Sequence, residues 1–290
     1  MKKYYLFFLV LLTSVMASAA NYTTYYLYPN GDMPYDNGIQ PSQEYDKDGW
    51  WHNTAVPLLN LYLPQGEQKG LIVSFPGGGY GALGHECDET SALWFLQHGY
   101  AVAVVKYRLP KWHCDIPLSD ACRAIELLRD SAQHWGIDGS KPLGVIGYSA
   151  GGHLAATVVT KFLTEKSRPD FGILCFPVIS LEIFRTHYGT RFELLGETPT
   201  SEQLIAWSAN KQVTDRTSPC FIVHCQDDDI VPVTHSVMMY EALIQQGIKA
   251  ELFCPSTGKH GWNLLSEHFS QRTACQQAIL QFISEITLVK

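Results

Sequence analysis

The most restrictive feature of the sequence is a glycine-rich segment with one serine, set between an apolar run and a helical pattern. This segment, GYSAGG at 147–152, follows the apolar run Leu143–Ile146 and precedes a helical pattern that begins at His153. A G-x-S-x-G turn between a strand and a helix lifts a serine hydroxyl to the end of the strand, and its glycines permit a strained backbone. The helix start also favours negative charge that develops beside Ser149. The pattern predicts a nucleophilic serine; a glycine turn that a serine merely caps is the alternative.

A second glycine run, PGGGY at 76–80, directly follows the apolar run Leu71–Phe75. Attack on an acyl carbon creates an oxyanion that needs N–H donors at about 3 Å, and glycines allow a backbone to turn its N–H groups toward one oxygen. The residue after the nucleophile supplies a further donor in such sites. We therefore expect Gly78, Gly79 and Ala150 to form an oxyanion hole; a merely flexible loop is the alternative.

The acid that supports such a serine should follow it along the chain and come after a strand. The apolar run Cys220–Cys225 ends in the sequence QDDDIVP at 226–232, which holds three adjacent carboxylates. The D-x-x-V-P frame favours Asp228 as the acid and leaves Asp227 as the alternative. We expect Asp227 and Asp229 to be solvated or to cap a helix.

A histidine comes last in this order, in GKHGW at 258–262. Glycines on both sides of His260 suit a loop that swings an imidazole over Ser149. The predicted role of His260 is to accept the Ser149 proton and pass it to the leaving group, while Asp228 fixes its tautomer.

Short apolar runs alternate with helical patterns from residue 55 onward, which is typical of βαβ units and a mostly parallel sheet. Several runs are continuously apolar, as in strands covered on both faces. Together with the chain order of serine, acid and histidine, this predicts the α/β class and the α/β-hydrolase fold, with helices on both faces of the sheet. The expected strands are Leu58–Leu63, Leu71–Phe75, Ala101–Tyr107, Leu143–Ile146, Phe171–Phe176, Cys220–Cys225 and Ala250–Phe253. The expected helices are Thr90–Gln97, Leu118–His134, His153–Leu163, Thr234–Gln246 and Glu267–Glu285.

The N-terminus has the pattern of a secretory signal peptide. Two lysines precede the apolar stretch 4–16, and the small residues ASAA follow at 17–20. The stretch falls short of the roughly 20 apolar residues of a membrane-spanning helix, so cleavage near Ala20 or Asn21 and export to a periplasm or the medium are expected. We expect three parts: a signal peptide at 1–20, an N-terminal extension packed on the domain at 21–54, and one catalytic domain at 55–290.

Composition excludes several classes of partner and cofactor. A net charge of −7 without any basic run argues against nucleic acid and against anionic lipid. No C-x-x-C pair or H-E-x-x-H motif occurs, so no metal and no other cofactor is expected. Cleavage would leave no segment for stable membrane insertion. The apolar settings of Cys175, Cys220, Cys225 and Cys254 indicate buried thiols, while a bridge among the remaining cysteines stays open.

Several segments together resemble the BD-FAE-type esterases, a group of α/β-hydrolases that includes bacterial feruloyl and acetylxylan esterases. These segments are PGGGY with His85-Glu86, KYRLP at 106–110, 120–138, GYSAGGHL at 147–154, and HYGTR with LLG at 187–196. The likeness runs from about residue 58 to 263. Cys87 stands where the family often has glycine, and Pro76 stands where other lipases have histidine. The resemblance implies hydrolysis of carbohydrate esters, most readily acetylated xylo-oligosaccharides.

The residues themselves imply only hydrolysis of an ester or amide through an acyl-enzyme. The expected partner is a small-molecule or oligosaccharide ester, and the candidates for binding it are Tyr80, Tyr148, Arg191 and Trp262. For each of them, packing within the core or a loop, without contact to substrate, is an equally good interpretation. A feruloyl or generic short-chain carboxylesterase, a peptidase similar to prolyl oligopeptidase, and a non-catalytic carbohydrate-binding module remain alternatives.

Overall fold

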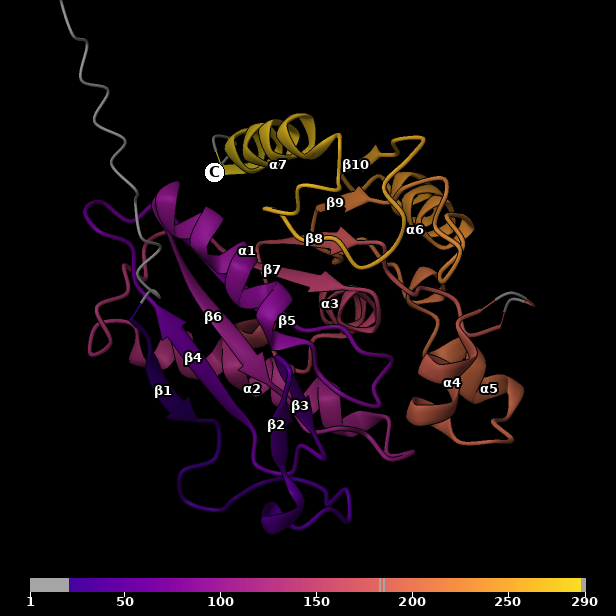
Figure 1. The fold of residues 1–290 in the computed structure, drawn as a ribbon, viewed down its shortest axis with the longest axis horizontal. Helices are drawn as coiled ribbons and strands as arrows, with labels where there is room; N and C mark the ends of the chain where they lie inside the picture. Colours follow the sequence, from indigo (N-terminus) through magenta and orange to yellow (C-terminus); the bar gives the residue numbers. More distant parts are fainter. Residues whose placement is uncertain (1–20, 183, 185, 288–290) are drawn as a thin grey trace, which may run out of the picture.

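A large twisted sheet forms the centre of the protein (Figure 1). The computed structural model describes residues 21–182, 184 and 186–287, so the predicted signal peptide lies outside the described residues. Within these ranges eight strands pair in the order β1-β4-β6-β5-β7-β8-β9-β10. β4 is antiparallel to both β1 and β6, and all pairs from β6 to β10 are parallel. The strands are β1 (Thr23–Tyr26), β4 (Leu58–Tyr62), β5 (Gly70–Phe75), β6 (Tyr100–Lys106), β7 (Leu143–Tyr148), β8 (Phe171–Cys175), β9 (Cys220–Val223) and β10 (Ala250–Phe253).

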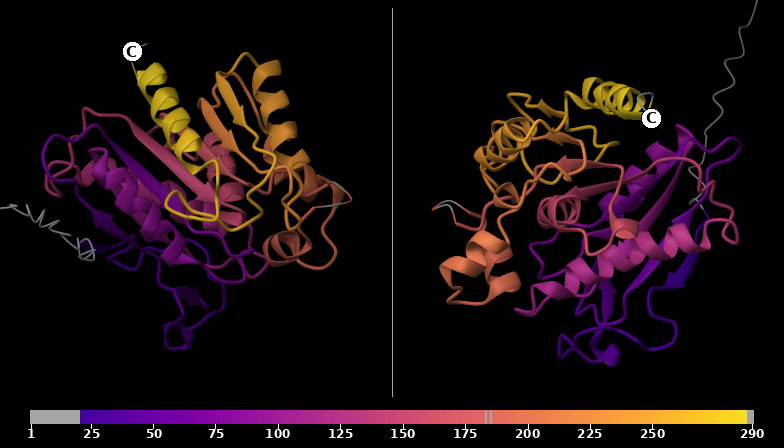
Figure 2. Two further views of the ribbon diagram at one scale, coloured as in Figure 1. Left: turned by 45° about the horizontal axis from the view of Figure 1, so that its top comes forward. Right: turned by 180° about the vertical axis from the view of Figure 1, so that it is seen from behind.

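Helices cover both faces of this sheet (Figure 2). One face packs against α1 (His85–Gln97) and α7 (Arg272–Thr287). The other packs against α2 (Asp115–Ser131), α3 (Ala150–Lys161) and α6 (Thr234–Gln245). The α/β-hydrolase fold and the mostly parallel sheet expected from the sequence are confirmed.

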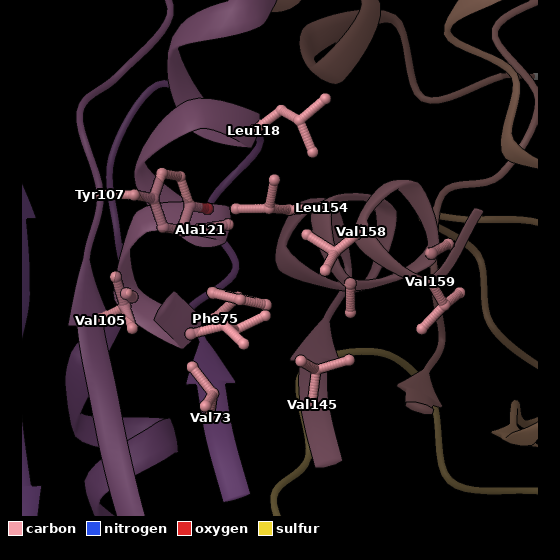
Figure 3. Packing of buried hydrophobic residues seen from close by; sticks show 14 of the residues in the cluster. Val73, Phe75, Val105, Tyr107, Leu118, Ala121, Val145, Leu154, Val158 and Val159 are labelled. Carbon is pink, nitrogen blue, oxygen red and sulfur yellow. The ribbon is translucent and has the colours of Figure 1, made fainter. Parts of the chain in front are cut away.

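The alternation of side chains along the strands divides the core into two clusters. Val73 of β5 and Val145 of β7 face α2 and α3, where they pack with Leu154 and Val158 (Figure 3). Their sequence neighbours, such as Ile146, point to the opposite face and join the cluster under α1 and α7. These side chains are fully buried, and each such aliphatic group stabilises the fold by about 1.5–3 kcal/mol. Burial on both faces explains why the central strands are apolar throughout.

The N-terminal segment packs against the central sheet and helix α1. β1 extends the sheet as its edge strand, and β2 (Tyr45–Lys47) pairs with β3 (Trp50–His52) in a separate hairpin. Trp51 of the hairpin stacks on His85 at the start of α1, with ring centroids 4.2 Å apart. The hairpin therefore lies against the first turn of α1, close to the end of β5 (Figure 1).

The remaining elements are short. They are three single 3₁₀ turns (Pro41–Gln43, Glu165–Ser167 and Ala209–Lys211), α4 (Tyr188–Leu195) and α5 (Ser201–Ala206), and the two short helices stand beside the main body in Figure 1. All eight cysteines lie in the described ranges and none forms a disulfide. Cys175, Cys220 and Cys225 are buried as expected, whereas Cys254, which directly follows the partly covered strand β10, is only half-buried. Among the described residues, no helix combines the length and the apolar character needed to cross a membrane.

Candidate active site

Ser149 occupies a strained turn between β7 and α3. Its backbone has φ 55° and ψ −115°, a region that residues with a side chain rarely adopt. Its N–H donates to the Cys175 carbonyl at 3.0 Å, so the turn is held by the neighbouring strand β8. A Cβ on Gly151 would lie 2.0 Å from the Phe75 carbonyl oxygen. Glycine is therefore obligatory at position 151, as the G-x-S-x-G pattern requires.

Ser149, His260 and Asp228 form a continuous hydrogen-bonded chain. His260 Nε2 lies 2.9 Å from Ser149 Oγ, and His260 Nδ1 lies 2.7 Å from Asp228 Oδ2. A carboxylate can only accept, so Nδ1 carries the ring proton and Nε2 is free to accept from the serine hydroxyl. This tautomer prepares the imidazole to remove the Ser149 proton.

Asp228 is held by several donors at once. Its Oδ1 accepts from the backbone N–H groups of Ile230 and Val231, both at 2.9 Å. Burial alone would raise the pKa of Asp228, but the hydrogen bonds from His224, His260 and the Val231 backbone hold it well below its usual range. The carboxylate therefore stays ionised beside His260. The first and fourth positions of the D-x-x-V-P frame, Asp228 and Val231, are thus joined by a hydrogen bond.

His224 is a part of this network that sequence reasoning missed. It is fully buried, and its Nε2 lies 3.1 Å from Asp228 Oδ2 and 2.9 Å from the Val231 carbonyl oxygen. Both neighbours accept, so Nε2 carries the proton and Nδ1 accepts from the Ser236 hydroxyl at 2.8 Å. No motif marks His224, which stands within the apolar run Cys220–Cys225 and directly follows β9.

The neighbouring aspartates have separate positions. Asp227 accepts the backbone N–H of Lys259 at 2.9 Å and so ties the histidine loop to the acid loop. This differs from the expected solvated or helix-capping role, because the two loops meet in space. Asp229 is exposed, 3.8 Å from the Lys259 ammonium.

The glycine loop after β5 lies against Ser149. The Gly78 carbonyl accepts from the N–H groups of Gly81 and Ala82, and the Pro76 carbonyl accepts from the Tyr107 hydroxyl at 2.6 Å. Gly78 has φ +131°, and a Cβ there would lie 2.1 Å from the Ala82 carbonyl oxygen, so only glycine fits. The carbonyl groups of Gly78 and Pro76 thus accept hydrogen bonds from the loop itself and from Tyr107.

A cavity of about 570 Å³ opens beside these groups. It contains Ser149 and His260 together with Gly78 and Gly79 of the glycine loop, while Ala150 follows Ser149 as the first residue of α3. The remaining lining residues are Gly49, Trp50, Gly77, Gly84, Glu86, Cys87, Asp88, Thr90, Tyr148, Phe176, His187, Ile230, Gly261 and Asn263.

Three of the four residues expected to bind substrate do not line this cavity. Tyr80 is buried, with its hydroxyl 2.9 Å from His153 Nδ1, and Trp262 is buried against Phe269. Arg191 lies over the Tyr188 ring, with 5.5 Å between the guanidinium and the ring centroid. Tyr80 and Trp262 thus show that a side chain close to a functional residue in sequence can point into the core, and substrate binding by these three residues stays a prediction. Tyr148 does line the cavity, and its hydroxyl donates to Ser91 Oγ.

The missed lining residues come from parts of the chain without a motif. Trp50 belongs to the N-terminal hairpin, His187 precedes α4, and Ile230 follows the acid. Glu86 and Asp88 belong to the first turn of α1. Within the described ranges, no three His, Cys, Asp or Glu side chains are grouped so that they could hold a metal ion.

Sequence comparisons find hydrolases among the relatives of this chain. A family model described as BD-FAE matches residues 59–170, and the prolyl oligopeptidase family matches residues 117–287. The chain is 35% identical over 207 residues, 69% of its length, to an acetylxylan esterase of Xylanibacter ruminicola. It is 32% identical over 234 residues, 74% of its length, to endo-1,4-beta-xylanase B of Butyrivibrio fibrisolvens. The match spans 42% and 36% of these two relatives, so the chain covers well under half of each.

A solved structure is similar over nearly its whole length. It is the acetyl ester-xyloside bifunctional hydrolase of Caldicellulosiruptor lactoaceticus, with a TM-score of 0.75 and 32% identity. The similarity covers 90% of this chain and 96% of that one. The carboxylesterase Cest-2923 of Lactobacillus plantarum shares the fold, with a TM-score of 0.70 at 19% identity, over 84% of this chain and 96% of that one.

Proposed function

Since the chain belongs to the BD-FAE-type esterases of the α/β-hydrolase fold, we propose that it is an exported serine carboxylesterase that removes acetyl groups from xylan-derived oligosaccharides. The observation that carries the proposal is the chain of hydrogen bonds from Ser149 Oγ through His260 to Asp228. Ser149 and His260 of this chain line a cavity. A serine hydroxyl with this support attacks acyl carbons.

The proposed reaction has two halves. Ser149 Oγ attacks the ester carbonyl while His260 Nε2 takes its proton, and His260 then returns that proton to the departing sugar oxygen. Water hydrolyses the acetyl-enzyme by the same route, releasing acetate and restoring the serine. The N–H groups of Gly78, Gly79 and Ala150 are the proposed donors to the oxyanion, and Asp228 stabilises the His260 cation. No cofactor enters this scheme.

The choice of acyl group and sugar rests on the relatives. An acetylxylan esterase, a xylanase and an acetyl ester-xyloside hydrolase are all named for xylan chemistry. The prolyl oligopeptidase match covers the part of the chain that holds the serine, acid and histidine, and it favours a peptidase as the second candidate. The relatives named for an activity on acetyl esters favour the esterase.

The first test is release of acetate and of ferulate from acylated xylo-oligosaccharides by the wild type and by Ser149→Ala. We expect acetate release by the wild type and a loss of at least about 10³-fold in kcat for Ser149→Ala. If the enzyme hydrolyses small synthetic esters but releases neither acetate nor ferulate from the oligosaccharides, it is a generic esterase. Cleavage of peptide amides alone would establish the peptidase instead.

Export is a separate part of the proposal. It rests on the signal-like sequence of residues 1–20, which lies outside the described residues, and the xylan chemistry named for the relatives fits an extracellular substrate. N-terminal sequencing of the protein recovered outside the cytoplasm should begin near Ala20 or Asn21. A protein that retains Met1 would contradict a cleaved signal.

A further inference from the structure

The N-terminal hairpin supplies an aromatic wall to the catalytic cavity. Trp50, the first residue of β3, is 43% exposed, although it is one of the largest apolar side chains of the protein. It lines the cavity that contains Ser149 and His260. An exposed tryptophan in a concave site offers an apolar face to a ligand at little cost in conformational entropy.

The tryptophan ring lies beside the glycine loop. Its benzo atoms would be 3.1 Å from a Cβ on Gly78 and 3.1–3.3 Å from a Cβ on Gly84. Two glycines thus leave the space in which the ring sits. On the next loop residue, a Cβ on Gly79 would lie 3.4 Å from His187 Cε1. Trp50 and His187 therefore both lie against the loop that borders Ser149.

His187 presents a hydrogen-bond donor at this place. Its Nδ1 accepts from the Thr190 backbone N–H at 3.2 Å and lies 2.8 Å from the Thr190 hydroxyl. Because Nδ1 accepts from a backbone N–H, the neutral ring carries its proton on Nε2. Burial lowers the pKa of His187, and the nearby His260 lowers it further, so the neutral form prevails near pH 7. Nε2–H forms no hydrogen bond to any residue within the described ranges.

A carboxylate completes the set. Glu86 also lines the cavity and lies next to the hairpin, where its Oε2 would be 2.6 Å from a Cβ on Gly49. An apolar ring, an N–H donor and a carboxylate acceptor complement a pyranose, which has apolar C–H faces and hydroxyls at its rim. A simple acetyl group would use none of these groups.

We propose that Trp50 and His187 form the binding subsite for the sugar ring of the leaving group, with the pyranose packed on Trp50 and a hydroxyl bound by His187 Nε2–H. This inference rests on the proposed function and assigns the N-terminal hairpin to substrate selection. Glu86 accepts from a second hydroxyl. The subsite explains how a serine esterase site, whose chemistry suits many esters, would select carbohydrate esters.

The test compares Trp50→Ala and Trp50→Phe with the matched control Trp112→Ala. Trp112 is also an exposed tryptophan, at 60%, but does not line the cavity. For each protein the ratio of kcat/KM for acetylated xylotriose to that for triacetin, an acetyl ester without a ring, is measured. We expect Trp50→Ala to lower this ratio about tenfold, mainly through KM, and Trp50→Phe to retain most of it. A ratio for Trp50→Ala that equals the ratio for Trp112→Ala would overturn the subsite.

Binding of unacetylated xylotriose, measured by calorimetry, separates this inference from the proposed function. Trp50→Ala should weaken that binding about tenfold, whether or not the enzyme releases acetate. A wild type that binds xylotriose but releases no acetate from its acetylated form would refute the proposed function and leave the subsite standing. A wild type with full acetyl esterase activity that does not bind xylotriose would refute the subsite alone.

Discussion

At the level of single residues, the carboxylate of Asp228 is shared between two histidines. Oδ2 accepts from His260 Nδ1 and from His224 Nε2, while Oδ1 is occupied by two backbone N–H groups. His224 is itself fixed by Ser236 and by the Val231 carbonyl. His224 therefore acts as a positioning residue, which orients the acid without touching substrate.

Replacement of His224 by phenylalanine should lower kcat while KM changes little. Loss of one charge-assisted hydrogen bond to Asp228 should cost about 1.5–3 kcal/mol, or roughly 10–100-fold in kcat. His224→Gln, whose amide N–H can replace Nε2–H, should recover most of the rate. Steady-state kinetics on triacetin, with thermal unfolding as a check on folding, would decide this. Equal rates for the phenylalanine and glutamine variants would show that the hydrogen bond has no part in catalysis.

The sequence could predict the groups that are tied to local backbone geometry and missed those that depend on the folded chain. Ser149 and Asp228 stand in turns whose shape demands particular neighbours, such as glycine at 151. Trp50 and His224 carry no such mark, since Trp50 reaches the cavity from the hairpin and His224 is buried directly after β9. Trp262 stands two residues after His260, yet its ring is buried in the core.

At the level of elements, the central parallel strands were predictable because burial on both faces makes them continuously apolar. β5, β7 and β8 begin within one residue of the expected positions, as do the other expected strands β4, β6, β9 and the edge strand β10. The short elements β1, β2, β3, α4 and α5 were not predicted, because their sequences are rich in polar and turn residues. α1 begins at His85 rather than Thr90, since its first turn is acidic and lacks an apolar pattern. α7 begins later, at Arg272.

A buried ion pair fastens the N-terminal segment to the body. Arg108 donates to the Asp120 carboxylate through Nε and Nη2, at 2.9 and 2.7 Å. Its Nη1 donates to the carbonyls of Pro34 and Tyr35, which precede the hairpin that carries Trp50. Both charged side chains are fully buried. The pair thus connects the segment after β6 and helix α2 to the N-terminal segment.

Arg108→Met should destabilise the fold by about 3–5 kcal/mol, because it leaves the Asp120 carboxylate buried without its partner. Urea unfolding would measure this loss. The double variant Arg108→Met with Asp120→Leu should regain a large part of it, since no uncompensated charge remains. If the double variant were less stable than Arg108→Met alone, the hydrogen bond that Asp120 accepts from the backbone N–H of residue 108 would outweigh the cost of its unpaired charge.

At the level of the whole molecule, the cavity lies at the carboxyl edge of the parallel strands. The loops after β5, β7 and β9 and the histidine loop after β10 meet there, as ligand sites do in open α/β sheets. The same edge holds a buried carboxyl group, Asp88, at the base of α1. Oδ1 of Asp88 accepts from Ser74 of β5, and Oδ2 has no hydrogen-bond partner within the described residues. Burial raises the pKa of Asp88 to about 8.

Asp88 should therefore make global stability fall as the pH rises. An unfolded aspartate loses its proton near pH 4, whereas folded Asp88 keeps it up to about pH 8, so unfolding releases a proton between these values. The stability that the neutral carboxyl allows is complete below about pH 4 and is lost as the pH passes through 8. Asp88→Asn removes this titration. We expect urea unfolding to show that the stability of Asp88→Asn relative to the wild type is higher at pH 8.5 than at pH 5, by on the order of 4 kcal/mol. Groups common to both proteins cancel in this difference, and a difference independent of pH would mean that Asp88 is already ionised at pH 5.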